Sequence, residues 1–174
     1  MGPGHTDHAA SILVVDDFVP IRQELCSIIG NMPGCQVVGQ ASDGLEAVQK
    51  SAELRPDLIL MDMALPTLDG IDAARRIWEL SSEVKILFVS QESSIHIVEC
   101  LLRIGAVGYV CKADVTAELA AAVLSALRGE QYVGRRFLIS RSATCVPLPV
   151  SPNLPDEGCG ASNPTGIVLV GSST

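Results

Sequence analysis

Short, continuously apolar runs recur along the chain, and each is followed by a longer segment with a helical pattern. The five runs lie at residues 12–15, 37–39, 58–61, 86–89 and 107–110. A strand with one face in water alternates apolar and polar residues, whereas a strand that is covered on both faces is apolar throughout. The runs are therefore typical of strands in a parallel sheet that is buried on both sides.

After each run, apolar residues recur at spacings of three and four, which is the period of an amphipathic helix. The expected buried stripes are Ile21, Leu25, Ile28 and Ile29; Leu45, Val48 and Ala52; Ile71, Ala74 and Trp78; Ile97, Leu101 and Ile104; and Leu119, Val123 and Leu127. Asp43 and Asp114 can cap helix starts, and Gly30, Gly105 and Gly129 lie where helices should end. Five consecutive strand–helix units predict a doubly wound α/β fold, with helices on both faces of a five-stranded parallel sheet and right-handed crossovers.

The pattern also divides the chain into regions. We expect a flexible leader at residues 1–10, the α/β domain at 11–130, and a short extension at 131–139 that packs near the last helix. From residue 140 to 174, Pro, Gly, Ser, Thr and Asn dominate, which is typical of an irregular or disordered tail. One apolar patch at 167–170 interrupts this tail. We interpret it as part of the irregular tail, and the alternative is a strand that adds to a sheet edge or to a partner.

Composition and charge exclude several classes of protein. The formal net charge is −8, which disfavours direct DNA binding, because contacts to phosphates need Lys and Arg. No run is long and apolar enough to span a bilayer, and residues 1–10 do not resemble a secretory signal. The six cysteines show no CxxC spacing, so most are expected to be reduced core residues. These features together predict a cytoplasmic protein without membrane association.

Polar side chains follow four of the five predicted strands. Asp16 and Asp17 follow the first strand, Asp62 the third, Ser90 the fourth, and Lys112 the fifth, after Cys111. In a parallel α/β sheet, the carboxyl ends of the strands form the ligand-binding edge, so these side chains should converge there.

The convergence has a chemical consequence. Three carboxylates close together repel one another, and a divalent cation relieves that repulsion. Ligands that are all oxygen atoms indicate Mg²⁺. Lys112 and Ser90 could then contact a phosphoryl group, which leaves Asp62 as the nucleophile that forms an aspartyl phosphate.

The residues that carry this chemistry lie in segments that resemble a known family. Residues 12–17 (ILVVDD), 57–62 (DLILMD), 65–70 (LPTLDG) and 105–112 (GAVGYVCK) resemble the receiver domains of two-component response regulators, which are CheY-like. The resemblance covers about residues 10–130, and the order and spacing of the segments both agree with it. It implies a flavodoxin-like strand order, 2-1-3-4-5.

The resemblance also implies roles for individual residues. Asp62 would accept a phosphoryl group from a sensor histidine kinase or a histidine phosphotransfer protein. Asp17, Asp62 and the backbone carbonyl of Ala64 would ligate Mg²⁺, with Asp16 acting mainly through a bound water. The domain would thus catalyse only its own phosphorylation and dephosphorylation, rather than act as a metabolic enzyme.

Other residues would bind or report the phosphoryl group. Lys112 and Ser90 would contact it, and Ser90 and Tyr109 would form a switch pair in which the serine moves toward the phosphate and the tyrosine turns inward. The surface expected to respond, at about residues 93–128, would bind an output protein that the sequence does not identify.

Within the family, the chain is most similar to bacterial receivers of the NarL/FixJ type, which carry a C-terminal helix-turn-helix domain. No pair of helices with a basic recognition helix follows residue 141, so we expect a receiver without that output domain. Whether it forms a homodimer stays open.

Two alternatives compete with this interpretation. Gln91 follows Ser90 where the family usually has a small residue, which raises the alternative of a pseudo-receiver that is not phosphorylated and acts as an interaction module. A Mg²⁺-dependent phosphatase is disfavoured because the chain lacks a second DxD-type pair of carboxylates. Dinucleotide-binding and nucleotide-hydrolysing proteins are disfavoured as well, because no GxGxxG or GxxxxGK[ST] motif is present.

Overall fold

The computed structural model describes residues 9–92 and 94–137. Most of the expected leader, and the expected tail with its apolar patch at 167–170, lie outside the described residues. No described helix has the length and apolar character needed to cross a membrane.

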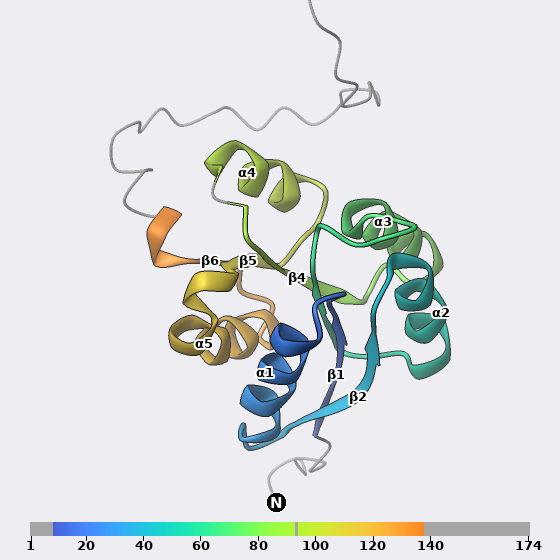
Figure 1. Cartoon of the computed structure of the whole chain (residues 1–174), viewed down its shortest axis with the longest axis horizontal. Helices are drawn as coiled ribbons and strands as arrows, with labels where there is room; N and C mark the ends of the chain where they lie inside the picture. Colours follow the sequence, from blue (N-terminus) through green and yellow to red (C-terminus); the bar gives the residue numbers. More distant parts are fainter. Residues whose placement is uncertain (1–8, 93, 138–174) are drawn as a thin grey trace, which may run out of the picture. The chain divides into compact units, whose positions relative to one another are not determined.

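The described chain alternates strands and helices, as the apolar runs predict (Figure 1). The strands are β1 (Ala10–Val15), β2 (Cys35–Ala41), β3 (Leu58–Met61), β4 (Lys85–Ser90), β5 (Gly108–Cys111) and β6 (Tyr132–Val133). The helices are α1 (Val19–Gly30), α2 (Gly44–Leu54), α3 (Gly70–Leu80), α4 (Ile95–Arg103) and α5 (Val115–Leu127), with a 3-10 turn, η1 (Lys112–Asp114), before α5.

All strand pairs are parallel, and the strand order is β2-β1-β3-β4-β5-β6. The predicted α/β fold and the order 2-1-3-4-5 are therefore confirmed. The short strand β6 extends the sheet beyond the five strands that we expected. Its two residues are too few to show an apolar run, so the pattern along the chain contains no sign of it.

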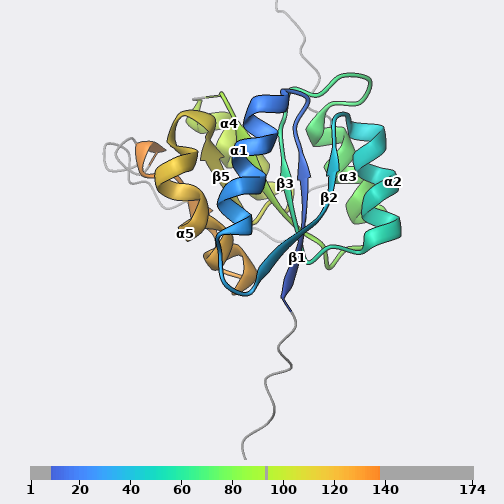
Figure 2. The same cartoon turned by 60° about the horizontal axis from the view of Figure 1, so that its bottom comes forward.

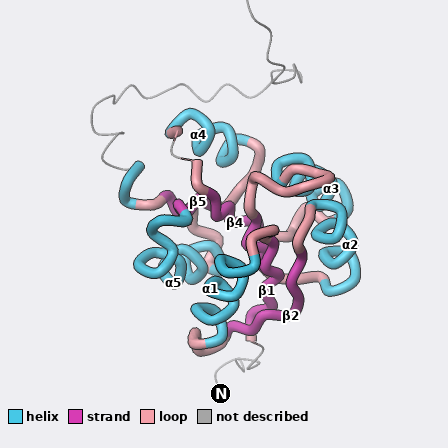
Figure 3. The backbone as a smooth tube through the Cα atoms, in the orientation of Figure 1, coloured by secondary structure: helices cyan, strands magenta, loops and turns pink. Residues whose placement is uncertain are grey.

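Helices cover both faces of the sheet, as Figures 2 and 3 show, and each face has its own apolar core. One core is formed with α2, α3 and α4 and includes Ile59, Ile77 and Leu101. The other is formed with α1 and α5 and includes Leu60 and Leu119. Successive residues of β3 thus point into opposite cores, which is why the strand is apolar throughout.

The helix α2 departs from its predicted stripe. Leu45 is 46% exposed, while the buried positions of this helix are Gly44, Ala47 and Ser51. A Cβ atom at Gly44 would lie 2.0 Å from the backbone oxygen of Leu68. The helix therefore approaches the loop before α3 so closely that small residues face inward. Of the predicted stripe, Val48 packs against the core, whereas Leu45 and Ala52 are exposed.

Helix caps and cysteines also differ in part from the expectation. Asp43 caps α2 by accepting a hydrogen bond from the Glu46 amide at 2.9 Å. Asp114 makes no capping hydrogen bond, because its carboxylate is paired with Arg136 at 3.2 Å. Of the four cysteines in the described residues, all free, Cys111 is buried but Cys100 is exposed. Burial is thus not common to these cysteines, because Cys100 lies on the outer side of α4.

Candidate functional site

Three carboxylates meet at the carboxyl ends of two neighbouring strands. Asp16 and Asp17 directly follow β1, and Asp62 directly follows β3, which pairs with β1. One carboxylate oxygen from each lies within 4.8 Å of the others. Asp16 and Asp62 are buried, at 0% and 3% exposure, whereas Asp17 is exposed. The cluster is therefore a buried acidic pair with a third carboxylate open to solvent.

Lys112, the residue after β5, reaches across to the buried pair. Its Nζ atom lies 2.7 Å from Asp62 Oδ2 and 2.7 Å from Asp16 Oδ2. The Asp62 contact is a hydrogen bond, whereas Asp16 Oδ2 is close enough for an ion pair but receives no hydrogen bond of good geometry from the described residues. One ammonium group thus serves two buried carboxylates, and one oxygen of Asp16 is left without a hydrogen bond among the described residues.

Burial and charge act in opposite directions on this cluster. Burial raises the pKa of Asp16 above its usual value of 3.8, and the neighbouring Lys112 offsets this only in part. Burial alone would lower the pKa of Lys112, but its short contacts with the Asp16 and Asp62 carboxylates and the attraction to their charges outweigh it, so the pKa is raised. Lys112 therefore stays protonated, and Asp16 is a carboxylate in an environment that disfavours its charge.

Backbone contacts fix the loop that carries Asp16. The Phe18 amide donates to Asp16 Oδ1 at 2.9 Å, and the Arg22 guanidinium donates to the Asp16 carbonyl at 2.5 Å. Arg22 also donates to Gln40 on β2 at 3.3 Å. From the sequence alone, we assigned no role to Arg22. Its position one helical turn after the acidic pair, at the start of α1, was the available signal.

A glycine lets the chain return to the acceptor candidate. The Gly70 amide donates to the Met63 carbonyl at 2.9 Å, and a Cβ atom at Gly70 would lie only 1.9 Å from the backbone oxygen of Asp62. The segment between Asp62 and α3 therefore folds back against the Asp62 backbone in a way that only glycine permits. The motif at 65–70 contained this glycine, but its spacing could not tell us what it touches.

Ser90 and Tyr109 lie on the next two strands of the sheet. Ser90 is the last residue of β4 and is buried, and Tyr109 on β5 is fully buried. The Tyr109 hydroxyl lies 3.0 Å from the Ser90 carbonyl and 2.5 Å from the Glu92 carbonyl, so it can donate to either. Burial raises the pKa of Tyr109, so its hydroxyl keeps its proton. The tyrosine is turned inward beneath the segment that follows β4.

The donor set fits a hard divalent cation. Three carboxylates and one ammonium group leave a net charge of −2 on the cluster when all are ionised, and oxygen ligands at this spacing suit Mg²⁺. Ala64 is exposed, and its amide lies 3.4 Å from Asp62 Oδ1, so it borders the cluster. The role of its carbonyl as a ligand stays a prediction. Gln91 is exposed, immediately after Ser90.

Comparison with known proteins identifies the family of this chain. The family model of the response regulator receiver domain matches residues 12–124, which is more than half of the chain. Response regulator GacA of Pseudomonas viridiflava is 34% identical over 122 residues, covering 70% of this chain and 57% of GacA. Transcriptional regulatory protein LiaR of Bacillus subtilis is 35% identical over 119 residues, covering 68% of this chain and 56% of LiaR. The chain thus spans a little over half the length of each of these relatives.

Solved structures show the same architecture. A two-component response regulator of the LuxR family from Aurantimonas aligns with a TM-score of 0.71 at 30% identity, covering 77% of this chain and 99% of that one. The match to the family model covers residues 12–124, and the strand order of the sheet is the one expected for this fold. The chain belongs to the response regulator receiver domain family.

Proposed function

We propose that Asp62 accepts a phosphoryl group and that the domain passes this signal on through its surface, as part of a two-component phosphorelay. The observation that carries the proposal is the shared Lys112 between two buried carboxylates, beside the exposed carboxylate of Asp17. A buried charge cluster that lacks a positive charge is costly to maintain, and it is the arrangement that a cation and a phosphoryl group would complete.

Each residue of the cluster has a distinct part in the proposed transfer. The Asp62 carboxylate attacks the phosphorus atom of a phosphohistidine, a P–O bond forms, the P–N bond breaks, and the imidazole leaves with the bonding pair and takes up a proton. Lys112 stays beside Asp62 and neutralises charge that develops on the phosphoryl oxygens. Bound Mg²⁺, held by Asp17, Asp62 and the Ala64 carbonyl, with Asp16 acting through water, would neutralise further charge.

The phosphoryl donor would be a sensor histidine kinase or a histidine phosphotransfer protein in the cytoplasm. Phosphorylation adds about one to two negative charges beside Lys112 and Ser90. Ser90 would donate its hydroxyl to a phosphoryl oxygen, while Tyr109 occupies the inward position behind it. The outer surface of α4, β5 and α5 would then bind the output partner.

A phosphate-affinity gel tests the proposal directly. The purified chain is incubated with Mg²⁺ and acetyl phosphate, and a slower-migrating band is expected. Asp62→Asn should abolish the band, while Asp72→Asn, which alters an exposed carboxylate on α3, should leave it intact. A band of equal intensity with Asp62→Asn would disprove the assignment of the acceptor.

The same experiment separates the receiver from the pseudo-receiver. A pseudo-receiver would give no band with acetyl phosphate or with any histidine kinase, and Mg²⁺ titration would show no binding. Gln91→Ala adds a check, because the exposed Gln91 side chain next to Ser90 could hinder access. A band that appears only in Gln91→Ala would identify this residue as the obstacle.

A further inference from the structure

The extension after α5 adds a strand to the edge of the sheet that carries Tyr109. Residues Tyr132–Val133 form β6, which pairs in parallel with β5. The Tyr132 amide donates to the Val107 carbonyl at 3.0 Å, and the Gly134 amide donates to the Tyr109 carbonyl at 3.1 Å. The backbone of Tyr109 is therefore bound on one side by β4 and on the other by the extension.

Two glycines make this close approach possible. A Cβ atom at Gly108 would lie 2.3 Å from the Tyr132 backbone oxygen, and one at Gly134 would lie 2.7 Å from Glu118 Oε2. Gly108 lies within β5, where a β-branched residue would otherwise favour the strand. Its contact with the Tyr132 backbone indicates that β5 is shaped to receive the extension.

Charged side chains on α5 and before it anchor the extension. The buried Glu118 carboxylate accepts a hydrogen bond from the Arg135 amide at 3.1 Å. The Arg136 guanidinium pairs with Asp114 at 3.2 Å on the surface. A carboxylate that is buried in this way needs its partner, so moving the extension away would leave Glu118 without the Arg135 amide.

The described part of the extension brings Phe137 against Tyr109. The Phe137 amide donates to the Gly134 carbonyl at 3.0 Å, which turns the chain so that the Phe137 ring meets the Tyr109 ring. The two rings pack edge to face, with centroids 5.3 Å apart and an angle of 89° between their planes. Phe137 is 2% exposed and Tyr109 is 0% exposed. The ring of Phe137 thus closes the apolar site that Tyr109 fills when it is turned inward.

We propose that the extension at residues 132–137 holds Tyr109 inward, with Phe137 as the positioning residue for the switch. An outward Tyr109 would lose the Phe137 ring as well as the Ser90 and Glu92 carbonyls, so docking of the extension and the inward tyrosine favour each other. The inference rests on the proposed function only for its second half, in which phosphorylation favours the same inward position. Because coupling between two states is reciprocal, phosphorylation would then tighten the docking of the extension.

The chain has two tyrosines, Tyr109 and Tyr132, so labelling with 3-fluorotyrosine gives two fluorine signals, which a Tyr132→Phe variant assigns. The measurement is the change in fluorine shift between H2O and D2O, which reports the exposure of the ring to solvent. In the wild type, Tyr109 should show no solvent effect. In Phe137→Ala and in Phe137→Leu, which keeps apolar volume at the site, Tyr109 should show one without phosphate.

Phosphorylation distinguishes a Tyr109 ring that can still turn inward from one that is exposed only because the Phe137 ring is missing. In both Phe137 variants, the solvent effect on Tyr109 should disappear after loading with acetyl phosphate. We also expect loading to be about two- to tenfold slower than in the wild type, the range that an aromatic pair supports. Gly108→Ala keeps both aromatic residues but pushes the backbone of β6 away from β5, so it should behave like Phe137→Leu. Leu80→Ala, which truncates a residue that is 67% exposed on α3, serves as the control and should match the wild type.

The outcomes separate this inference from the proposed function. A Tyr109 ring that is as protected in the variants as in the wild type would overturn the inference, and so would exposure that persists in a sample that the gel shows to be loaded. Failure to load in the wild type would count against the phosphoacceptor role of Asp62 instead. In that case, the exposure measured without phosphate still decides whether Phe137 positions Tyr109.

Discussion

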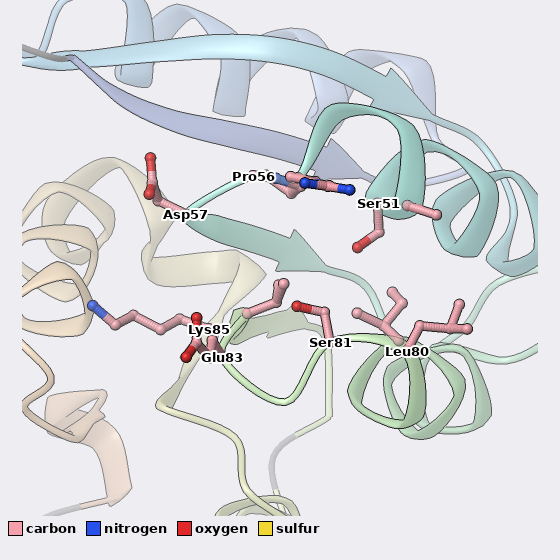
Figure 4. A pocket seen from close by; sticks show the side chains of 11 residues that line it. Ser51, Pro56, Asp57, Leu80, Ser81, Glu83 and Lys85 are labelled. Atoms are coloured by element: carbon pink, nitrogen blue, oxygen red, sulfur yellow. The ribbon is translucent and has the colours of Figure 1, made fainter.

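The two ends of the parallel sheet handle charge in opposite ways. At the carboxyl ends, Asp16, Asp62 and Lys112 are buried together, and one ammonium group serves two carboxylates. At the amino ends of β3 and β4 there is a hollow of about 640 Å³ (Figure 4). It is lined by Ser51, Ala52, Arg55, Pro56, Asp57, Ile77, Leu80, Ser81, Glu83, Val84 and Lys85. The acidic cluster of the proposed phosphoacceptor site lies at the other end.

Two of the charged residues around the hollow, Asp57 and Lys85, have hydrogen-bond partners outside it. Asp57 accepts hydrogen bonds from the Ser11 amide and hydroxyl at 2.8 and 2.7 Å. The Lys85 side chain extends away from Ser51 and Ser81, as Figure 4 shows, and donates to the Leu127 carbonyl at 2.7 Å. The two ends therefore differ in that, among the described residues, buried charge is left unbalanced only at the carboxyl ends, where we place the proposed site.

Glycines at the helix ends differ between the two ends of the sheet. At the carboxyl ends, a Cβ atom on Gly44 or Gly70 would meet backbone oxygen atoms at 2.0 and 1.9 Å, respectively. At the far ends of α1 and α5, a Cβ atom on Gly30 or Gly129 would have nothing within 4 Å. Backbone segments are packed against one another around the acidic cluster, whereas the ends of α1 and α5 leave room for a side chain at Gly30 and Gly129.

The largest difference in stability effects between the two ends should come from replacing their lysines, Lys112 and Lys85. Lys112→Ala leaves two buried carboxylates uncompensated and should lower the free energy of unfolding by about 3–5 kcal/mol in EDTA. Lys85→Ala removes one hydrogen bond to a carbonyl and should lower it by about 1 kcal/mol. Urea denaturation at pH 7 measures both. Mg²⁺ should restore part of the loss only in Lys112→Ala, and equal losses in the two variants would remove the contrast.

A pair of glycine substitutions gives the next largest effect. Gly70→Ala drives a methyl group against the Asp62 backbone and should destabilise the fold by about 1–3 kcal/mol, with slower phosphorylation of Asp62. Gly30→Ala meets no atom and should raise stability by about 0.5–1 kcal/mol, because alanine is favoured over glycine in a helix. Thermal denaturation and a phosphate-affinity gel follow the two effects. A harmless Gly70→Ala would show that the loop can move away from Asp62.

Replacing a carboxylate with an amide should change the free energy of unfolding with opposite signs at the two ends of the sheet. Because the pKa of Asp16 is raised in the folded state, its charge opposes folding above that pKa. Asp16→Asn should therefore stabilise the protein by about 1 kcal/mol at pH 7 without Mg²⁺. As the pH falls through the pKa of folded Asp16, the wild type gains a proton there and the advantage of the asparagine shrinks.

Asp57→Asn supplies the control for that experiment. It weakens two hydrogen bonds to a carboxylate and should destabilise the fold by about 1–2 kcal/mol at pH 7. Urea denaturation between pH 5 and pH 8 in EDTA compares the two variants. An advantage of Asp16→Asn that grows toward acid pH would contradict a raised pKa for Asp16 in the folded state.

The smallest effect is expected at the end of α2, beside the hollow. Arg55 has a positive φ of 46°, a left-handed conformation that disfavours residues with a Cβ atom. Arg55→Gly should raise stability by less than about 1 kcal/mol and leave the phosphorylation of Asp62 unchanged. Thermal denaturation and the phosphate-affinity gel provide the two readings. Slower phosphorylation in this variant would link the hollow to the acidic cluster.

Much of the fold was predictable because the strands at the core of this sheet are continuously apolar in sequence. β3 was predicted with its bounds, since a strand covered on both faces must be apolar along its whole length. The acidic cluster was predictable for a related reason, because strand ends in a parallel sheet share one edge. Asp16, Asp17, Asp62 and Lys112 meet there as expected.

The features that the sequence did not predict depend on close contacts between backbone segments and on contacts between residues far apart in the sequence. The inward face of α2 is set by the approach of Gly44 to Leu68, which no apolar period reports. Asp114 was expected to cap a helix, but Arg136 takes its carboxylate. The contact between Phe137 and Tyr109 joins residues from the extension and from β5, and nothing in their spacing indicates it.

The two residues of β6 also decide how the sheet meets its surroundings. If β5 were an unpaired edge strand, it would present a row of free amide and carbonyl groups to which a strand of another molecule could pair. In this protein, the Val107 and Tyr109 carbonyls are taken by the amides of Tyr132 and Gly134, and the outermost strand is only two residues long. The segment that touches the tyrosine thus also blunts the sheet against edge-to-edge aggregation.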